Sequence, residues 1–192
     1  PRDDPQRRQD RRCLHRGALM ADGFVRGEAC GASLLVGEIA PEMTRILAAG
    51  VGHHGRGASL TAPNSKAQER LLNAALADAD LVAASIGVVE AAANGSPVGD
   101  AVEAGAVAGA LLRVHAAVLH VGTAKANVGH TEAASGLVGL SKLSLQLQRM
   151  RTTSVGTLAR TSASVTAALR PAARRALFSV GVGRLPVESS GS

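Results

Sequence analysis

The stretch AAVLHVGTAKANVGHTEAASGLVGLSKLSLQLQRM, residues 116–150, decides how the fold is interpreted. Its first part, 116–124, is a short apolar run typical of a buried strand. The run from Thr131 to Met150 is apolar on most faces, which predicts a helix buried between layers. Lys125 and His130 lie between these two predicted elements. The pattern therefore predicts two polar side chains at the place where a strand leads into a buried helix.

Predicted strands and helices alternate on both sides of this stretch. Helical spacing predicts a helix over 64–80, with Ser65 and Gln68 in capping-box positions. A second helix is predicted over 100–112, with Asp100 as its N-cap. Further short apolar runs predict strands at 31–37, 44–50, 86–91 and 175–183. This alternation predicts an α/β sheet covered by helices on both faces.

Composition excludes several classes of protein. The chain has 192 residues, of which 46% are hydrophobic, with no Trp or Tyr and 2 Phe, so its core must consist of Ala, Val and Leu. No apolar run approaches the ~20 residues of a membrane span, and the N-terminal region lacks the apolar core of a secretory signal. Cys13 and Cys30 form neither a C-x-x-C pair nor a disulfide framework. We expect a soluble cytoplasmic protein without a membrane partner.

The positive charge is concentrated near the two ends of the chain. The formal net charge is +6, and arginines cluster in residues 1–12 and 169–175. Neither cluster is accompanied by stacking aromatic residues, so no nucleic-acid partner is expected. We expect a disordered basic N-terminal segment over 1–20, a folded domain over 21–185 and a flexible tail over 186–192.

Three segments, in this order, resemble the β-ketoacyl synthase family, the condensing domain of polyketide synthases. ADGFVRGEACG (21–31) is similar to the family's A-D-G-[FY]-V-R-G-E-G-C-G. GRGASLTAPNSKAQERLL (55–72) is similar to G-R-S-N-G-L-T-A-P-N-G-P-A-Q-E-R, and KANVGHTEAASGLVGLSK (125–142) to K-S-N-I-G-H-T-E-A-A-A-G-V-A-G-L-I-K. The resemblance implies that the domain over 21–185 is the second α/β half of a thiolase-like fold, with a mixed sheet and helices on both faces.

The resemblance also implies an activity and its partners. Members of the family are acyltransferases that condense acyl and malonyl thioesters, with decarboxylation, in polyketide and fatty acid synthesis. The thioesters are carried by the phosphopantetheine arm of an acyl carrier protein, so the implied partners are a carrier protein and a complementing ketosynthase half, with a homo-oligomer as a further possibility. No metal or dissociable cofactor is implied, and the histidines in GHHG (52–55) have no third ligand at a suitable spacing.

Five residues match functional positions of the family. Lys125 and His130 match the lysine and the second catalytic histidine. The resemblance implies that Lys125 supplies charge and orientation, while His130 donates a hydrogen bond to the thioester carbonyl. Asn127 and Glu132 match residues assigned here to holding the loop, and Val180 occupies the position of the family's gating phenylalanine.

Two departures from the family pattern bear on catalysis. Where the family has V-E-A-H-G-T-G-T-P-L-G-D, residues 89–100 are VEAAANGSPVGD, so Ala92 replaces the first histidine and cannot donate a hydrogen bond. The T-A-C-S-S pattern of the acyl-accepting cysteine does not occur in these residues, and Cys13 and Cys30 match structural positions. Two interpretations remain: part of a condensing enzyme that is inactive as an isolated chain, or a non-catalytic structural or interaction module descended from one.

Overall fold

The structure is a computed structural model that describes residues 23–37, 43–53, 63–113, 118–153, 162–169 and 176–178. The expected segments 1–20 and 186–192 lie outside the described residues, as do Cys13 and Val180. The boundaries expected for the domain therefore stay predictions.

Three short strands form one parallel sheet. Across the sheet they are β1 (Val88–Glu90), β2 (Leu119–Gly122) and β3 (Ala176–Phe178). Each lies inside a segment that the sequence predicted to be a strand. The antiparallel strands that a mixed sheet would add are not among the described residues.

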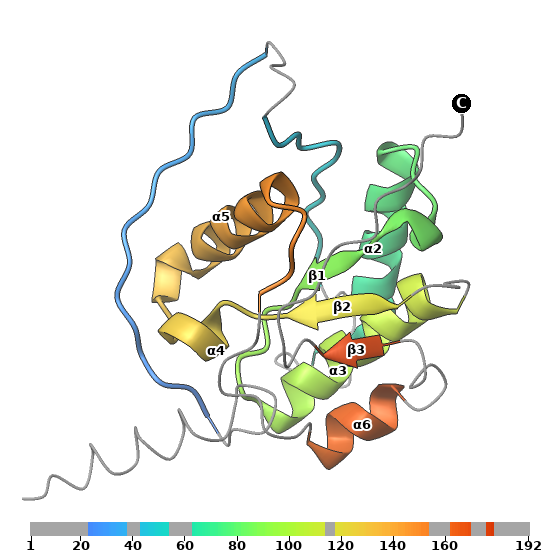
Figure 1. Cartoon of the computed structure of the whole chain (residues 1–192). Coiled ribbons are helices and arrows are strands. Elements are labelled where there is room, and N and C mark those ends of the chain that lie inside the picture. The colour runs from blue at the N-terminus through green and yellow to red at the C-terminus, as the bar shows by residue number, and fades with distance from the viewer. Residues whose placement is uncertain are drawn as a thin grey trace, which may run out of the picture.

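Helices lie on two sides of the strands. The main helices are α2 (Ser65–Asp78), α3 (Pro97–Val107), α5 (Ser135–Gln148) and α6 (Ala163–Leu169), and the short turns are η1 (Ala83–Ser85), η2 (Ala108–Leu112), α4 (Lys125–Val128) and η3 (Glu132–Ala134). Figure 1 shows α5 on one side of the strands and α3 with α6 on the other. In the described part of the chain, no helix combines the length and the apolar character needed to span a bilayer.

The hydrophobic core lies among α3, η2, α6 and the sheet. Its largest buried members are Val107, Leu111, Leu112, Leu119, Val121, Val165 and Leu169. These are aliphatic residues, as the composition predicted, and they come from segments that are far apart in the sequence. The core thus fixes the positions of β1 and β2, whose carboxyl ends carry the candidate site.

The prediction of strands at 31–37 and 44–50 was wrong. Both segments are described and contain no regular secondary structure, and Leu34 is 87% and Ile46 53% exposed. Figure 1 shows the N-terminal segment passing outside α4 and α5. An apolar run forms a strand only where another segment pairs with its backbone, and these two runs have no such partner among the described residues.

The start of α2 differs from the prediction by one residue. Asn64, not Ser65, is the N-cap: its Oδ1 accepts hydrogen bonds from the amide nitrogens of Lys66 at 3.0 Å and Ala67 at 3.2 Å. The predicted capping box of Ser65 and Gln68 is therefore wrong. The short amide side chain of an extended residue satisfies the free N–H groups of the first turn directly.

The start of α3 also lies earlier than predicted. Ser96, rather than Asp100, is the N-cap, and its Oγ accepts the Gly99 N–H at 3.1 Å. Pro97 occupies the first turn, where its missing N–H costs nothing. As a result Asp100 lies within the first turn and is buried, so its carboxylate faces the preceding loop.

Candidate functional site

Lys125 is the first residue of α4, a single helical turn that follows β2, and His130 comes directly after its C-cap, Gly129. The turn ends at Gly129, whose φ of 80° lies in the left-handed region that favours glycine. A Cβ on Gly129 would also lie 3.0 Å from the backbone nitrogen of Gly27. The segment between β2 and α5 therefore contains a short helix that the sequence pattern did not predict. The prediction that α5 is buried between layers was wrong: its buried residues are Gly139 and Gln146, and Leu145 is 48% exposed.

The backbone of His130 is held by the extended segment 23–37. The His130 N–H donates to the carbonyl oxygen of Val25 at 2.7 Å, and the Gly27 N–H donates to the carbonyl oxygen of His130 at 2.9 Å. These two bonds form an isolated parallel bridge between Arg26 and His130. Segment 23–37 thus positions the histidine even though it forms no strand.

The imidazole of His130 is held in one tautomer. Its Nδ1 accepts the backbone N–H of Glu132 at 2.9 Å and lies 3.3 Å from the Ser135 Oγ. The Phe24 ring packs beside it, with ring centroids 4.6 Å apart. Because Nδ1 accepts a hydrogen bond from an amide, the neutral ring must carry its proton on Nε2. In the neutral ring, the Nε2–H of His130 is therefore the hydrogen-bond donor.

The Glu132 side chain links the loop to segment 23–37. It lies 3.5 Å from the Arg26 guanidinium, in an ion pair in which both side chains are exposed, and it is the Glu132 backbone that contacts His130. Asn127 lies within α4 and is exposed. The supporting roles expected for Glu132 and Asn127 stay predictions.

Lys125 contacts the position at which the family has its first histidine. Its Nζ donates to the backbone carbonyl oxygen of Ala92 at 2.7 Å. The side chain is half-buried, and this burial lowers the pKa of Lys125, whereas the carboxylates of Glu103, Glu90 and Asp100 partly oppose the shift. The structure therefore brings Lys125 to Ala92, while His130 faces Glu132 and Ser135.

Two carboxylates of α3 hold the loop that contains Ala92, and sequence reasoning missed both. Glu103 accepts the N–H groups of Ala92 at 2.7 Å and Ala93 at 2.9 Å. Asp100 accepts the Gly95 N–H at 3.1 Å. Residues three apart lie on the same face of a helix, so Asp100 and Glu103 both point toward the loop. This spacing was the signal available in the sequence. The loop is therefore fixed through its backbone.

The titration of Asp100 should make stability depend on pH. Burial, opposed by the Gly95 N–H, raises the pKa of Asp100 from 3.8 to about 6. Folding therefore favours the protonated form, and this contribution to stability is complete below about pH 4 and is lost as the pH rises through about 6. We expect Asp100→Asn to raise the free energy of unfolding by about 1–2 kcal/mol at about pH 7.5 and to change it little at about pH 4. Urea denaturation at the two pH values tests this, and an equal effect at both would contradict it.

Glu90, at the carboxyl end of β1, joins three elements. Its Oε1 accepts the Ala124 N–H before α4, and its Oε2 lies 2.7 Å from the Lys142 Nζ of α5. The Glu90 and Lys142 side chains are only 9% and 13% exposed. Gly139 makes room for this pair, because a Cβ there would lie 3.1 Å from the Glu90 Cγ. Glu90 is thus a buried anchor for the site that sequence reasoning also missed.

Cys30 lies beside α5. Its exposed thiol lines a cleft of about 610 Å³ along α5, together with Leu137 and Leu145. Within the residues described, no group of three His, Cys, Asp or Glu side chains is placed to hold a metal ion. The site therefore offers hydrogen-bond donors and one ammonium group.

Known proteins of one family resemble this chain. Residues 43–155 match the family model for the β-ketoacyl synthase, C-terminal domain. The polyketide synthase GfsA of Streptomyces halstedii is 38% identical over 139 residues, which is 68% of this chain and 2% of that protein. The PKS-NRPS hybrid synthetase ATPKS of Aspergillus niger is 43% identical over 106 residues, which is 54% of this chain and 6% of that protein.

A solved ketosynthase has a similar fold. The oxazolomycin ketosynthase domain OzmH KS7 of Streptomyces albus matches with a TM-score of 0.68 at 26% identity, over 77% of this chain and 25% of that chain. The chain thus spans a quarter of that ketosynthase and a small fraction of the curated relatives. The expected thiolase-like α/β fold is confirmed. The chain belongs to the β-ketoacyl synthase family, and it matches the C-terminal domain of that family over more than half of its length.

Proposed function

We propose that the chain forms the C-terminal half of a ketosynthase site for the decarboxylative condensation of acyl and malonyl thioesters. The observation that carries this proposal is the hydrogen bond from the Glu132 N–H to the His130 Nδ1, at 2.9 Å. It leaves a proton on Nε2, where it can donate to a thioester carbonyl. As CO₂ leaves malonyl thioester, negative charge develops on that oxygen, and a preorganised donor stabilises it.

In the proposal, the other site residues support the function of His130. Lys125 supplies a positive charge beside the loop of Ala92, to whose carbonyl oxygen it is bound. Asn127, Glu132 and Val180 support the site. The substrate is carried by the phosphopantetheine arm of an acyl carrier protein in the cytoplasm, so the chain itself needs no cofactor.

Ala92 is the reason to propose that the isolated chain is inactive. Its methyl group cannot donate the second hydrogen bond that the family's first histidine provides. The backbone of Ala92 is held on both sides: its N–H donates to the Glu103 carboxylate, and its carbonyl oxygen accepts from the Lys125 Nζ. The position nevertheless lacks the imidazole of the family's histidine. Only half of the donor set for decarboxylation is therefore present.

We expect no condensation by the native chain. Incubation with acetyl- and malonyl-carrier protein, followed by mass spectrometry, should give no condensed product and no acylated Cys13 or Cys30, because a reactive thiol needs a base or a helix dipole beside it. A matched sample with Ala92→His and a cysteine-bearing N-terminal ketosynthase half should form product, whereas native Ala92 with the same half should not. Product from the native chain would contradict the proposal of inactivity.

A second candidate function is a non-catalytic interaction module, which Ala92 also favours. In that role the chain binds a carrier protein or a ketosynthase half without turnover. Two measurements separate the candidates. Calorimetry shows whether the native chain binds malonyl-carrier protein. If it binds, and if the Ala92→His variant with the complementing half still forms no product, the result supports the interaction module. Sedimentation in the same samples reports whether the chain associates with itself.

A further inference from the structure

The cleft along α5 is large enough for a small molecule. Its volume is about 610 Å³, within the range of about 300–1,000 Å³ that is usual for ligand pockets. Leu137, Val138 and Leu145 supply an apolar wall, and neither Lys125 nor His130 is among the residues that line the cleft. The cleft can therefore hold an apolar chain.

The C-terminal end of α5 places two arginines at this cleft. Arg149 is the C-cap, and Met150 follows with a φ of 48°, in the left-handed region. The Met150 N–H donates to the carbonyl oxygen of Leu147 at 3.1 Å, and the Arg151 N–H to that of Gln146 at 3.0 Å. This pair of bonds is a Schellman motif, which turns the chain back at the helix end. Arg149 and Arg151 consequently both line the cleft.

The two arginines give this end of the cleft a positive charge. The third charged residue that lines it, Lys142, is paired with Glu90, whereas no ion pair within the described residues involves Arg149 or Arg151. No acidic side chain is among the described residues that line the cleft. The end of a helix carries only about half a negative charge, so two guanidinium groups outweigh it. A carboxylate can therefore be bound here by charge-assisted hydrogen bonds.

Gln146 adds a polar group without a partner to the same cleft. It lines the cleft and is only 4% exposed. Its Nε2 donates to the Thr153 Oγ1 at 2.9 Å, whereas its buried Oε1 has no hydrogen-bond partner in the described part of the chain. Buried acceptors are nearly always paired, so this oxygen calls for a donor from a ligand. Gln146 and Arg149 are three residues apart on one helix face, which places that donor close to the bound carboxylate.

We propose that the cleft binds a carboxylic acid that has an apolar chain and a hydroxyl group close to its carboxylate. The carboxylate pairs with Arg149 and Arg151, and the hydroxyl donates to the Gln146 Oε1. The apolar chain lies against Leu137 and Leu145. A β-hydroxy fatty acid has these three parts in this order. This binding site does not depend on the proposed function.

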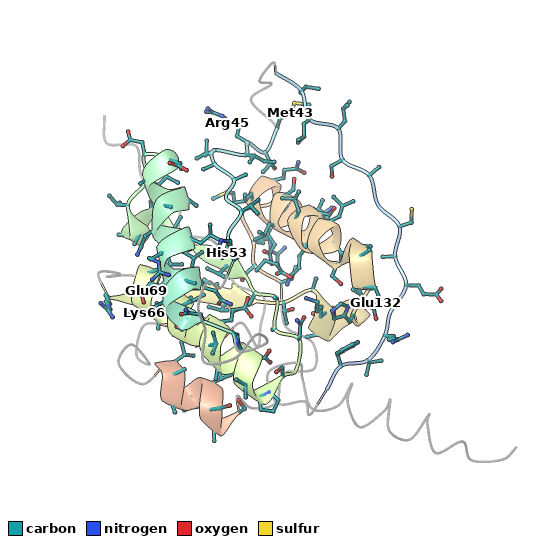
Figure 2. The ribbon with its side chains drawn as sticks, turned by 180° about the vertical axis from the view of Figure 1, so that it is seen from behind. Met43, Arg45, His53, Lys66, Glu69 and Glu132 are labelled. Carbon is teal, nitrogen blue, oxygen red and sulfur yellow. The ribbon has the colours of Figure 1, made fainter. Side chains whose placement is uncertain are left out.

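A second groove at the same end of α5 provides a control. Met43, Arg45 and Leu147 are among the residues that line it, and Figure 2 shows Met43 and Arg45 beside this end of the helix. No described residue that lines this groove has a buried polar atom without a partner. Arg45 is exposed, as Arg149 is. Arg45→Gln is therefore the matched control for the loss of the cleft arginines.

The experiment measures binding of β-hydroxydecanoate to the native full-length chain. Calorimetry gives Kd, and alkylation by N-ethylmaleimide locates the ligand, because the exposed Cys30 thiol lines the cleft. Saturating ligand should slow the alkylation of Cys30, followed by peptide mass spectrometry, at least about threefold, since the bound chain covers the thiol. The double variant Arg149→Gln, Arg151→Gln should raise Kd at least about tenfold, whereas Arg45→Gln should change it less than about twofold.

Decanoate tests the role of Gln146, because it differs from β-hydroxydecanoate only in lacking the hydroxyl. The native chain should bind decanoate about fivefold more weakly, and Gln146→Met should bind both acids equally. The comparison of the two acids on the native chain stands even if Gln146→Met does not fold. Equal binding of both acids by the native chain, unchanged alkylation of Cys30, or equal losses in Arg45→Gln and the double variant would each overturn the proposal. No carrier protein or condensation is involved, so failure of the proposed function leaves these measurements unaffected.

Discussion

Replacing Glu90 by alanine is expected to lower the free energy of unfolding by about 3–5 kcal/mol, because it leaves a buried ammonium group without its partner. Lys142 is only 13% exposed and lies 2.7 Å from the Glu90 carboxylate. The same change removes the acceptor of the Ala124 N–H at the start of α4. Urea denaturation followed by circular dichroism measures the loss, which should appear as a lower midpoint or as the absence of a folded baseline.

Two matched variants show whether the loss comes from the buried pair. Arg26→Gln removes an exposed ion pair with Glu132, which should cost only about 0–1 kcal/mol. The double variant Glu90→Met, Lys142→Met replaces both buried charges by apolar groups and should recover most of the loss, since no unpaired charge remains. If Glu90→Ala costs no more than Arg26→Gln, the pair does not hold β1 to α5.

The elements that could be predicted are those whose signal is local. The strands β1 and β2 follow from short apolar runs, and α2, α3 and α5 follow from helical spacing. The segments 31–37 and 44–50 have equally apolar runs, yet they are not strands. A strand depends on a partner segment, and nothing in the run itself states whether that partner is present.

In the candidate site, too, only the residues with a local sequence signal could be predicted. Lys125 and His130 could be named in advance because their motif resembles that of a family. The hydrogen bond from Lys125 to Ala92 could not, because its acceptor is a backbone carbonyl, which any residue supplies. The roles of Asp100 and Glu103 were missed because the predicted start of α3 was too late. Asp100 was predicted to be the N-cap, but α3 begins at Pro97, and Asp100 is therefore a buried residue of its first turn.

The crossing of segment 23–37 over the loop before α5 yields the second large expected effect. Gly27 lies so close to the end of α4, just before this loop, that a Cβ there would be 2.1 Å from the carbonyl oxygen of Val128. That oxygen belongs to the backbone and cannot rotate away as a flexible side chain would. Gly27→Ala must therefore separate the two segments and break both backbone hydrogen bonds between His130 and residues 25–27.

We expect Gly27→Ala to lower the free energy of local opening around His130 by about 2–3 kcal/mol, because two hydrogen bonds are lost and a steric clash is introduced. Hydrogen exchange should report this as roughly 30- to 150-fold faster exchange of the His130 amide, while amides in α3 keep their protection. Gly37→Ala is the control, because a Cβ there meets nothing within 4 Å and should leave exchange unchanged. Unchanged exchange at His130 in Gly27→Ala would show that segment 23–37 does not position the histidine. Faster exchange would instead show that a segment without regular secondary structure holds the backbone of the proposed hydrogen-bond donor, because its two backbone hydrogen bonds to His130 form only where Gly27 lets the two backbones approach.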